Sequence, residues 1–404
     1  MTRLRALLGR LSGAGTFVAD QVVPKAELLV VRTVPDFDDQ GVEFVRQWGA
    51  ASEVPVIWLA DAVPADGPPP KVADCRERFG DRFRVLPIRS VRGYWAYFRA
   101  RVVVHTTGTH NSHRGSRRKV YVNLWHGMPL KRLRPDAPAG RRQTDLLLVT
   151  SAVHARNFSQ TWDLTADQVA ITGLPRNDAL LRASAQPRPA RIEALTGGRP
   201  LVLWLPTFRE SVGKIARSDG RDFGNVFQMP AADVADVAEH FDRLGLHVLV
   251  KPHPKAPTAS PVSLPGLSIW TDKTVQRSGM SLYEILGHAD VLLTDHSSVW
   301  VDYLLVRRPM IFTIADLDAY AQNRGHYFTP LTDYLPGPVA TTMPELYTLL
   351  AGIADVTTDW RASRDEALTL HHAHVDARSS ERAVRAVAAR SGLPVASPHA
   401  PLSR

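Results

Sequence analysis

The feature of this sequence that most limits its fold is a series of short apolar runs separated by stretches with helical spacing. A strand buried on both faces reads as a continuous apolar run, whereas a helix shows apolar residues at intervals of three or four. Alternation of the two is typical of parallel sheets whose strands are connected by helices. The first runs lie at Glu27–Arg32, Pro55–Leu59, Phe83–Ile88, Arg101–His105, Lys119–Leu124, Asp145–Thr150 and Gln168–Thr172, with helical stretches at Gln40–Ala50, Ser90–Ala100 and Ala152–Thr161.

A second series follows a Pro- and Gly-containing connection at Ser184–Pro200. At 404 residues the chain exceeds a single core and suits two domains of about 150 to 200 residues each. We therefore predict an α/β fold of two Rossmann-like, doubly wound lobes, 23–185 and 200–390, with an interlobe cleft and a flexible tail at 391–404. The later strands are expected at Leu201–Leu205, Leu246–Val250, Leu267–Trp270, Val291–Thr294 and Met310–Thr313, and the helices near Ala231–Leu244, Ser298–Val306 and Met343–Ala351.

The charge of the chain favours anionic partners. The formal charge is +9, and only eight of the 49 basic residues are Lys. Guanidinium groups pair bidentately with phosphate, so nucleotides, phosphate polymers, nucleic acid and anionic lipid all fit, although a GC-rich genome explains the excess of Arg equally well. Because Cys75 is the only Cys, we expect no internal disulfide and no cysteine-based metal site. No apolar run is long enough for a transmembrane helix.

Residues 1–22 begin with a short basic amphipathic pattern. One interpretation is a helix that lies on an anionic membrane surface, and the other is a helix packed on its own domain. Arg10 interrupts the apolar stretch, which argues against a signal peptide. The apolar positions are Leu4, Leu7, Leu8 and Leu11, and the basic ones are Arg3, Arg5 and Arg10.

Polar residues follow four of the apolar runs directly. Open α/β sheets bind ligands beyond the carboxyl ends of their strands, so these positions are candidates for a site. One strand-end His is more often structural than catalytic, but one in each lobe favours a functional pair. The four motifs are Trp125-His126-Gly127, Pro206-Thr207-Phe208-Arg209, Lys251-Pro252-His253-Pro254 and Asp295-His296-Ser297-Ser298.

Two of these motifs suit a phosphate group. Ser297 or Ser298 can cap the helix that follows, whose free N–H groups would bind a phosphate, although such a cap is often only structural. Lys251 and His253 stand in a loop stiffened by two Pro residues, which makes either a fixed pair of phosphate donors or merely a rigid exit from the strand.

Two further positions are candidates because of the residues around them. Arg176 lies in the turn sequence Gly173–Asp178, and Lys131 lies in the strongly basic stretch Arg114–Arg142, which would attract a polyanionic acceptor or a membrane, or is a solvated surface. No nucleic-acid motif accompanies it, so no nucleic-acid partner is expected. The sequence also lacks the fingerprints of Rossmann dehydrogenases, P-loop kinases, α/β-hydrolases and zincins, and it shows no compact acid pair suited to magnesium.

Taken together, these motifs resemble the CDP-glycerol:poly(glycerophosphate) glycerophosphotransferase family, in family order from Gly93 to Pro338. The matching segments are Gly93-Tyr94-Trp95, Leu124–Lys131, Gly173–Asp178, Pro206–Arg209, Lys251–Pro254, Thr294–Val299, Asp302-Tyr303, Pro309, Asp316-Leu317, Tyr320, Arg324–Tyr327 and Pro336–Pro338. Two positions depart from the family pattern, since Met128 replaces a threonine and His296 a tyrosine, and both could retune substrate choice.

The resemblance implies a GT-B architecture, with an acceptor lobe at 23–185 and a CDP-alditol donor lobe at 200–390, and a peripheral enzyme on the cytoplasmic face of the membrane. It implies that no metal or cofactor is used, and that His126 and His253 are catalytic. Together with the strand-end reading, it gives these expected substrate-binding residues: Lys131, Arg176, Thr207, Arg209, Lys251, Asp295, Ser297, Ser298, Asp302 and Arg324.

The expected reaction is transfer of glycerol phosphate from CDP-glycerol to a hydroxyl of a lipid-linked anionic or glycerol-phosphate polymer acceptor, with release of CMP. His126 is assigned as general base and His253 to the leaving-group side, and the two roles are exchangeable. The alternatives are a CDP-ribitol-using phosphotransferase, a GT-B glycosyltransferase using a nucleotide sugar, and an inactive membrane-surface binding protein.

Overall fold

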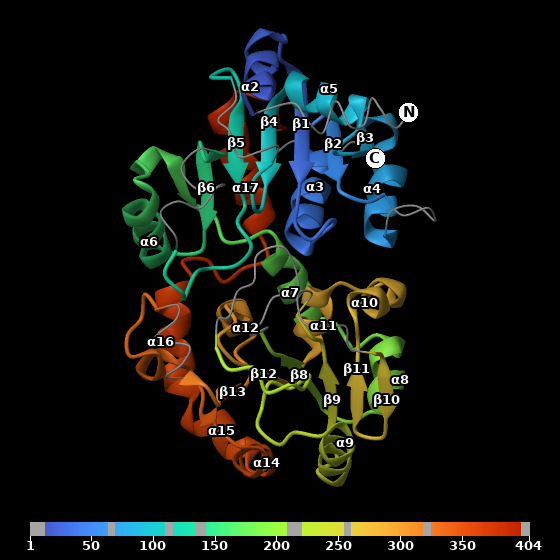
Figure 1. Ribbon diagram of the computed structural model, residues 1–404, viewed down its shortest axis with the longest axis vertical. Helices are drawn as coiled ribbons and strands as arrows, with labels where there is room; N and C mark the ends of the chain where they lie inside the picture. Colours follow the sequence, from blue (N-terminus) through green and yellow to red (C-terminus); the bar gives the residue numbers. More distant parts are fainter. Residues whose placement is uncertain are drawn as a thin grey trace. The chain divides into compact units, whose positions relative to one another are not determined.

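The structure is a computed structural model that describes residues 13–63, 69–109, 116–133, 143–207, 220–253, 260–317 and 325–396. It divides into two compact units. Unit 1 comprises Met1–His126, Leu133–Asp178 and Ala373–Arg404, and unit 2 comprises Gly127–Arg132 and Ala179–His372. Each unit contains its own, mostly parallel sheet (Figure 1).

In the described part of unit 1, seven strands form one sheet in the order β3-β2-β1-β4-β5-β6-β7. Every neighbouring pair is parallel. This is the doubly wound Rossmann order, whose switch point lies between the first and fourth strands. The strands are β1 (Ala26–Arg32), β2 (Val56–Ala60), β3 (Phe83–Pro87), β4 (Ala100–His105), β5 (Val120–Asn123), β6 (Leu146–Val149) and β7 (Val169–Ile171).

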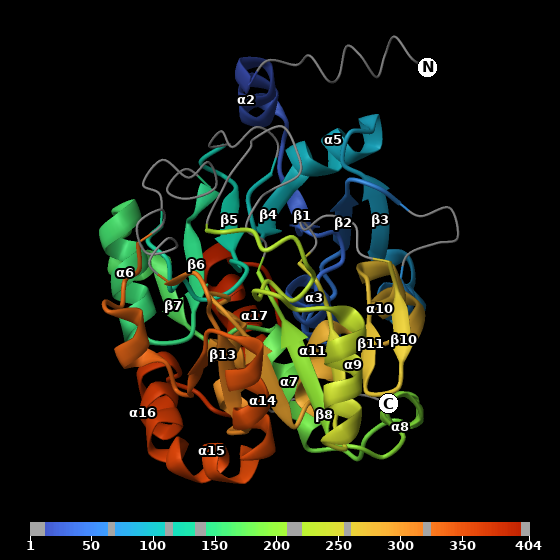
Figure 2. The same cartoon turned by 60° about the horizontal axis from the view of Figure 1, so that its bottom comes forward.

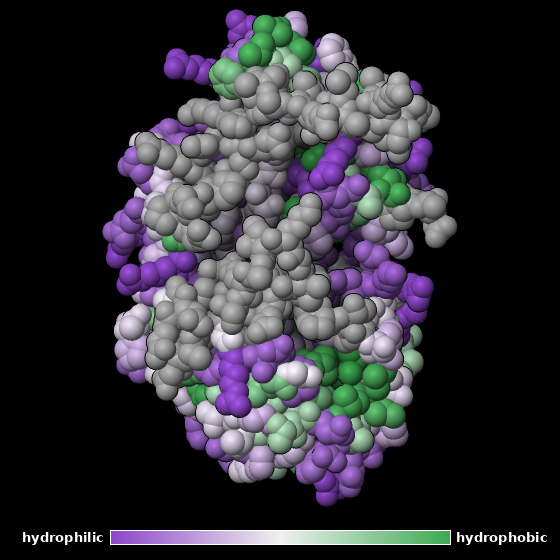
Figure 3. Space-filling model, in the orientation of Figure 1, coloured by the Kyte–Doolittle hydropathy of each residue, from purple (hydrophilic) through white to green (hydrophobic). Residues whose placement is uncertain are grey.

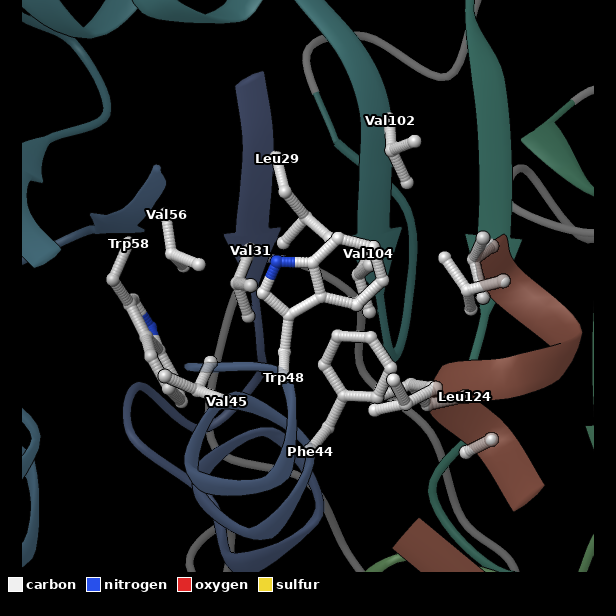
Figure 4. Packing of buried hydrophobic residues seen from close by; sticks show 14 of the residues in the cluster. Leu29, Val31, Phe44, Val45, Trp48, Val56, Trp58, Val102, Val104 and Leu124 are labelled. Carbon is white, nitrogen blue, oxygen red and sulfur yellow. The ribbon is translucent and has the colours of Figure 1, made fainter. Parts of the chain in front are cut away.

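Helices cover both faces of this sheet, because successive strand residues point to opposite sides. Leu29 and Val31 face α3 (Asp39–Ala51) and α17 (Ser379–Ser391), whereas Val30 faces α5 (Val91–Arg99). Figure 4 shows the Phe44 and Trp48 rings of α3 pointing at β1 and β4. Both rings are fully buried, and truncating such a side chain to Ala typically costs about 3–5 kcal/mol.

The remaining elements of unit 1 are short connections and covering helices. They are α2 (Gly13–Val22), α4 (Pro70–Phe79), η1 (Gly80–Arg82), α6 (Ala152–Trp162), η4 (Ala166–Gln168) and the first residues of α7 (Arg176–Ser184).

The described part of unit 2 also holds a seven-stranded sheet, in the order β10-β11-β9-β8-β12-β13-β14. Apart from the antiparallel β10–β11 pair, its strands are parallel and repeat the Rossmann order around β8 and β12. The strands are β8 (Leu201–Leu205), β9 (His247–Val250), β10 (Val262–Leu264), β11 (Leu267–Ile269), β12 (Val291–Thr294), β13 (Met310–Thr313) and β14 (Val339–Ala340).

The core of unit 2 lies between this sheet and the helices α9 (Val234–Arg243) and α14 (Met343–Ala351), which cover the same face (Figure 2). Trp204 and Phe241 are fully buried there. The other elements are α8 (Ala190–Thr196), α10 (Asp272–Ser278), α11 (Leu282–His288), α12 (Val299–Tyr303), η5 (Leu304–Val306), η6 (Leu331–Tyr334), α15 (Ile353–Asp359) and α16 (Arg361–His371).

The predicted α/β class with two Rossmann-like sheets is confirmed, and all twelve expected strands are present within a residue or two. The sequence did not indicate β10 and β14, which span only three and two residues. Among the helices that the structure describes, none is long and apolar enough to cross a membrane.

The expected lobe boundaries differ from this division in two ways. Residues 373–390 belong to unit 1, because α17 packs Ala383, Val384 and Val387 into the core of the first sheet. The chain passes to unit 2 inside α7, after Asp178, and the connection expected at 184–200 contains α8. Of the expected N-terminal helix and tail, 1–12 and 397–404 lie outside the described residues.

Candidate functional site

His126 lies just beyond the carboxyl end of β5 and is exposed. Its ring Nδ1 is 3.2 Å from the main-chain carbonyl oxygen of Thr106, a fully buried residue that directly follows β4. Thr106 is itself tied to the end of β1, since its N–H donates to the Arg32 carbonyl and its hydroxyl accepts the Val34 N–H. The switch point of the first sheet therefore supports His126.

This contact assigns the tautomer of His126. A carbonyl oxygen can only accept a hydrogen bond, so the proton of the neutral ring lies on Nδ1, which donates to Thr106. The lone pair is then on Nε2, as a general base requires. The sequence identified His126 but not Thr106, because a main-chain carbonyl leaves no residue-type signal.

The backbone on both sides of His126 adopts positive φ angles. Trp125 has φ +56° and Gly127 has φ +133°. A non-Gly residue in the left-handed region is strained and persists only where its surroundings enforce it. Packing holds Trp125 in this conformation. Its ring centroid lies 5.4 Å from that of Phe158, 5.0 Å from that of Trp162 and 4.1 Å from that of His126, and the two adjacent rings are tilted by 30°.

Arg176 supports His126 from the first turn of α7. Its guanidinium Nη1 donates to the His126 carbonyl oxygen over 3.1 Å, and its side chain is almost wholly buried. Two residues further on, the Asp178 carboxylate accepts the N–H groups of Ser379 and Ser380 at the start of α17. The Gly173–Asp178 segment thus holds together parts of unit 1 that are distant in sequence.

A second His near these strand ends is buried and has a structural role. His105 ends β4 and is fully buried, with Nδ1 accepting the Gly108 N–H and Nε2 donating to the Gln143 carbonyl. Burial lowers the pKa of His105 to about 4. It therefore stays neutral at physiological pH and fixes the loop that carries Thr106.

In unit 2, Thr207 and Asp295 meet at the second switch point, beyond β8 and β12. The Asp295 carboxylate accepts the Thr207 N–H at 3.0 and 3.1 Å and the Thr207 hydroxyl at 2.9 Å. Asp295 is 1% exposed, and its carboxylate holds the loop after β8 in place. The two residues predicted from separate motifs are thus adjacent.

Ser297 and Ser298 open α12 and are half-buried. Ser298 occupies the N-cap position without making a side-chain capping bond, whereas the Ser297 hydroxyl accepts the Val299 N–H at 3.4 Å. Asp302 lies further along α12, fully buried, and accepts the Tyr283 hydroxyl over 2.6 Å. This hydrogen bond joins α11 and α12.

Lys251 and His253 follow β9. The Lys251 ammonium lies 2.5 Å from the Asp272 carboxylate and donates to the Pro252 carbonyl over 3.2 Å. His253 is half-buried in unit 2, whereas His126 belongs to unit 1. The convergence of the two His residues stays a prediction.

Lys131 lies in a short segment that pairs with 325–327 within unit 2. Lys131 and His326 form an antiparallel bridge, and the Tyr327 N–H donates to the Leu130 carbonyl over 2.8 Å. The buried His326 ring stacks on His296, whose Nε2 is 3.5 Å from the Asp316 carboxylate. His296, the departure from the family pattern, is thus part of a buried polar cluster.

Two expected substrate contacts, Arg209 and Arg324, lie outside the described residues. Within the described residues, no group of three or more His, Cys, Asp or Glu side chains is arranged to hold a metal ion.

Comparisons with known proteins give relatives of this chain in sequence and in fold. The profile of the family described as CDP-Glycerol:Poly(glycerophosphate) glycerophosphotransferase matches residues 49–389. A teichoic acid poly(glycerol phosphate) polymerase from Staphylococcus epidermidis is 27% identical over 249 residues, which cover 55% of this chain and 32% of that protein. A teichoic acid ribitol-phosphate primase from Bacillus spizizenii is 26% identical, over 59% of this chain and 57% of that protein. The match therefore spans only part of each relative's length.

Solved structures show the same fold. The wall teichoic acid polymerase TagF superposes with a TM-score of 0.73 at 20% identity, covering 96% of this chain and 95% of that one. A UDP-N-acetylglucosamine 2-epimerase superposes with a TM-score of 0.52 at 13% identity, covering 92% of this chain and 99% of that one. The fold is accordingly GT-B-like.

Proposed function

Since the chain belongs to the CDP-glycerol:poly(glycerophosphate) glycerophosphotransferase family, we propose that it transfers glycerol phosphate from CDP-glycerol to a hydroxyl of a lipid-linked or glycerol-phosphate polymer acceptor. The product would be a teichoic acid or a related cell-surface polymer. The observation that carries the proposal is the Nδ1 contact of His126, which leaves the basic lone pair on Nε2.

In the proposed reaction the acceptor oxygen attacks the phosphorus next to glycerol. The new phosphate ester bond forms as the bond to the bridging oxygen of the pyrophosphate breaks, and CMP leaves. His126 Nε2 takes the proton of the acceptor hydroxyl, and the Thr106 carbonyl stabilises the ring as it becomes charged. No metal or cofactor takes part, so activity should persist in EDTA.

Unit 2 is the proposed donor lobe. Thr207, fixed by Asp295, stands with Ser297 and Ser298 around its switch point, where nucleotides bind in this class of sheet. His253 and Lys251, beyond β9, would stabilise the charge growing on CMP, and Lys131, Arg209 and Arg324 complete the proposed phosphate contacts.

Purified protein should release CMP from CDP-glycerol when a lipid-linked acceptor is present, and mass spectrometry should show the acceptor extended by glycerol phosphate. His126→Ala and His253→Ala should each lower turnover at least about 10²-fold. His240→Ala is the control, because that ring stacks on Tyr347 at the surface of α9. Turnover of CDP-ribitol instead would assign the other alditol.

Two outcomes would replace the proposal. Release of UDP from a UDP-sugar, with a sugar on the acceptor, would indicate a GT-B glycosyltransferase. Tight acceptor binding with no nucleotide turnover would indicate a binding protein.

We propose that the chain acts at the cytoplasmic face of the membrane, bound through α2 and α5. Their exposed apolar residues include Phe17, Val22 and Trp95, with the Arg99 guanidinium 5.9 Å from the Trp95 ring. Figure 3 shows hydrophobic surface over α2. Apolar side chains beside cations suit an anionic lipid surface. Val22→Glu should weaken co-sedimentation with phosphatidylglycerol vesicles, and Val375→Glu, also exposed, should not.

A further inference from the structure

Gln40 makes two hydrogen bonds that join separate segments of unit 1. It lies in the first turn of α3 and is fully buried. Its side-chain Nε2 donates to the Leu124 carbonyl over 2.8 Å, and its Oε1 accepts the Arg176 N–H over 3.2 Å. The partners fix the amide orientation, because a carbonyl accepts and an N–H donates.

Both segments lead to His126. Leu124 stands two residues before it, and Arg176 donates from its guanidinium to the His126 carbonyl. Gln40 thus holds the Leu124 carbonyl directly, and through Arg176 it holds the His126 carbonyl. These two carbonyls lie on either side of the strained Trp125. Breaking the link would release the loop that aims the His126 ring at Thr106.

The first turn of α3 is rigidly placed, so Gln40 is a fixed support. The Asp38 carboxylate caps the helix by accepting the Gly41 N–H, and the Asp38 N–H donates to the Thr33 hydroxyl. A Cβ on Gly41 would lie only 2.6 Å from the Thr33 methyl group and 2.7 Å from the Trp58 ring. The helix therefore begins in direct contact with β2 and with the residue that follows β1.

We propose that Gln40 is a positioning residue for His126, holding the loop in the geometry in which Nδ1 donates to Thr106 and Nε2 faces the reacting hydroxyl. Gln40 lies before residues 49–389, the region matched by the family profile. The inference concerns the orientation of His126 as the base and rests on the function proposed above.

Two variants test it. Gln40→Met removes both hydrogen bonds at nearly constant volume, and Gln40→Glu keeps the acceptor for the Arg176 N–H but places an oxygen against the Leu124 carbonyl. Both should lower kcat about 10- to 100-fold, because small misplacements of a reacting group have effects of that size, while the KM for CDP-glycerol changes less than twofold. Gln47→Met and Gln47→Glu, half-buried on the same helix, are the matched controls.

The second readout does not depend on activity. ¹⁵N-histidine NMR reports the tautomer of His126, assigned by the resonance lost in His126→Asn. Wild type should show the Nδ1–H form, and folded Gln40→Glu should show a mixture of forms. Unchanged kcat, or an unchanged tautomer in a folded variant, would overturn the role of Gln40. If Gln40→Met fails to fold, Gln40→Glu decides. If wild type does not turn over CDP-glycerol, the proposed function fails, while the NMR result still judges Gln40.

Discussion

The His126 ring donates from Nδ1 to the carbonyl oxygen of Thr106 over 3.2 Å, so a residue at the end of β4 sets the tautomer of a residue beyond β5. Two adjacent parallel strands deliver the pair to the same edge of the sheet. A main-chain carbonyl at the end of one strand therefore fixes the position of the ring proton on a His beyond the next strand.

His126→Asn should abolish catalysis without disturbing the loop. The Asn amide can donate to the Thr106 carbonyl as Nδ1 does, but it offers no basic nitrogen. We expect kcat at least about 10²-fold below wild type and an unchanged unfolding temperature. Steady-state CMP release and differential scanning calorimetry measure the two quantities. Activity close to wild type would remove His126 from the role of base.

Asp295→Asn should loosen Thr207. The carboxylate accepts three contacts from Thr207, and an amide would present its NH₂ to one of those donors. We expect the free energy of unfolding to fall by about 1–3 kcal/mol and the KM for CDP-glycerol to rise several-fold. Urea denaturation and steady-state kinetics are the measurements. Asp333→Asn, at an exposed carboxylate, is the matched control, and equal effects of the two changes would contradict the prediction.

Asp20→Asn should strongly destabilise unit 1. Asp20 is buried and pairs with the ammonium groups of Lys25 at 2.9 Å and Lys119 at 2.5 Å. Burial lowers the pKa of Lys119 to about 8, partly offset by Asp20. Removing the carboxylate leaves two buried cations facing each other, at a cost of about 3–5 kcal/mol.

Chemical denaturation checks this against Asp81→Asn, which removes a fully exposed carboxylate paired with Arg84. That change should leave the stability close to that of wild type, because solvent screens an exposed ion pair. A loss of stability at Asp20 no larger than at Asp81 would show that the buried pairs are dispensable.

His105 should contribute a loss of stability in acid. Its folded pKa of about 4 lies below the ordinary 6.5, so between these values the unfolded chain binds more protons than the folded one. Stability is therefore fully present above pH 6.5 and decreases as pH falls toward 4, by up to about 3 kcal/mol from this group. Burial also lowers the pKa of His371, to about 3, which adds in the same direction.

His105→Gln should make the decline shallower, because glutamine can still donate to the Gln143 carbonyl but does not titrate in this range. Denaturation midpoints at several pH values between 4 and 7.5 give the slope. An equally steep decline in the variant would assign the acid sensitivity elsewhere.

Much of the architecture was predictable because strands of parallel sheets are buried on both faces. The continuous apolar run at β1 and the alternation with α3 and α5 need no tertiary information, and the strand-end rule then pointed to His126, Thr207 and Asp295. The membership of α17 was not predictable, since its apolar face fits either sheet by periodicity alone.

The sequence by itself determined the element order, the two sheets and the polar residues at the ends of their strands, because local apolar pattern dictates burial. Only the tertiary structure decided what those polar residues contact. Arg176 holds the carbonyl of His126, Asp302 binds Tyr283, and Gln40 joins two loops. Partners of this kind lie as far apart as the 202 residues between Asp178 and Ser380, and the satisfaction of buried donors and acceptors selects them in three dimensions.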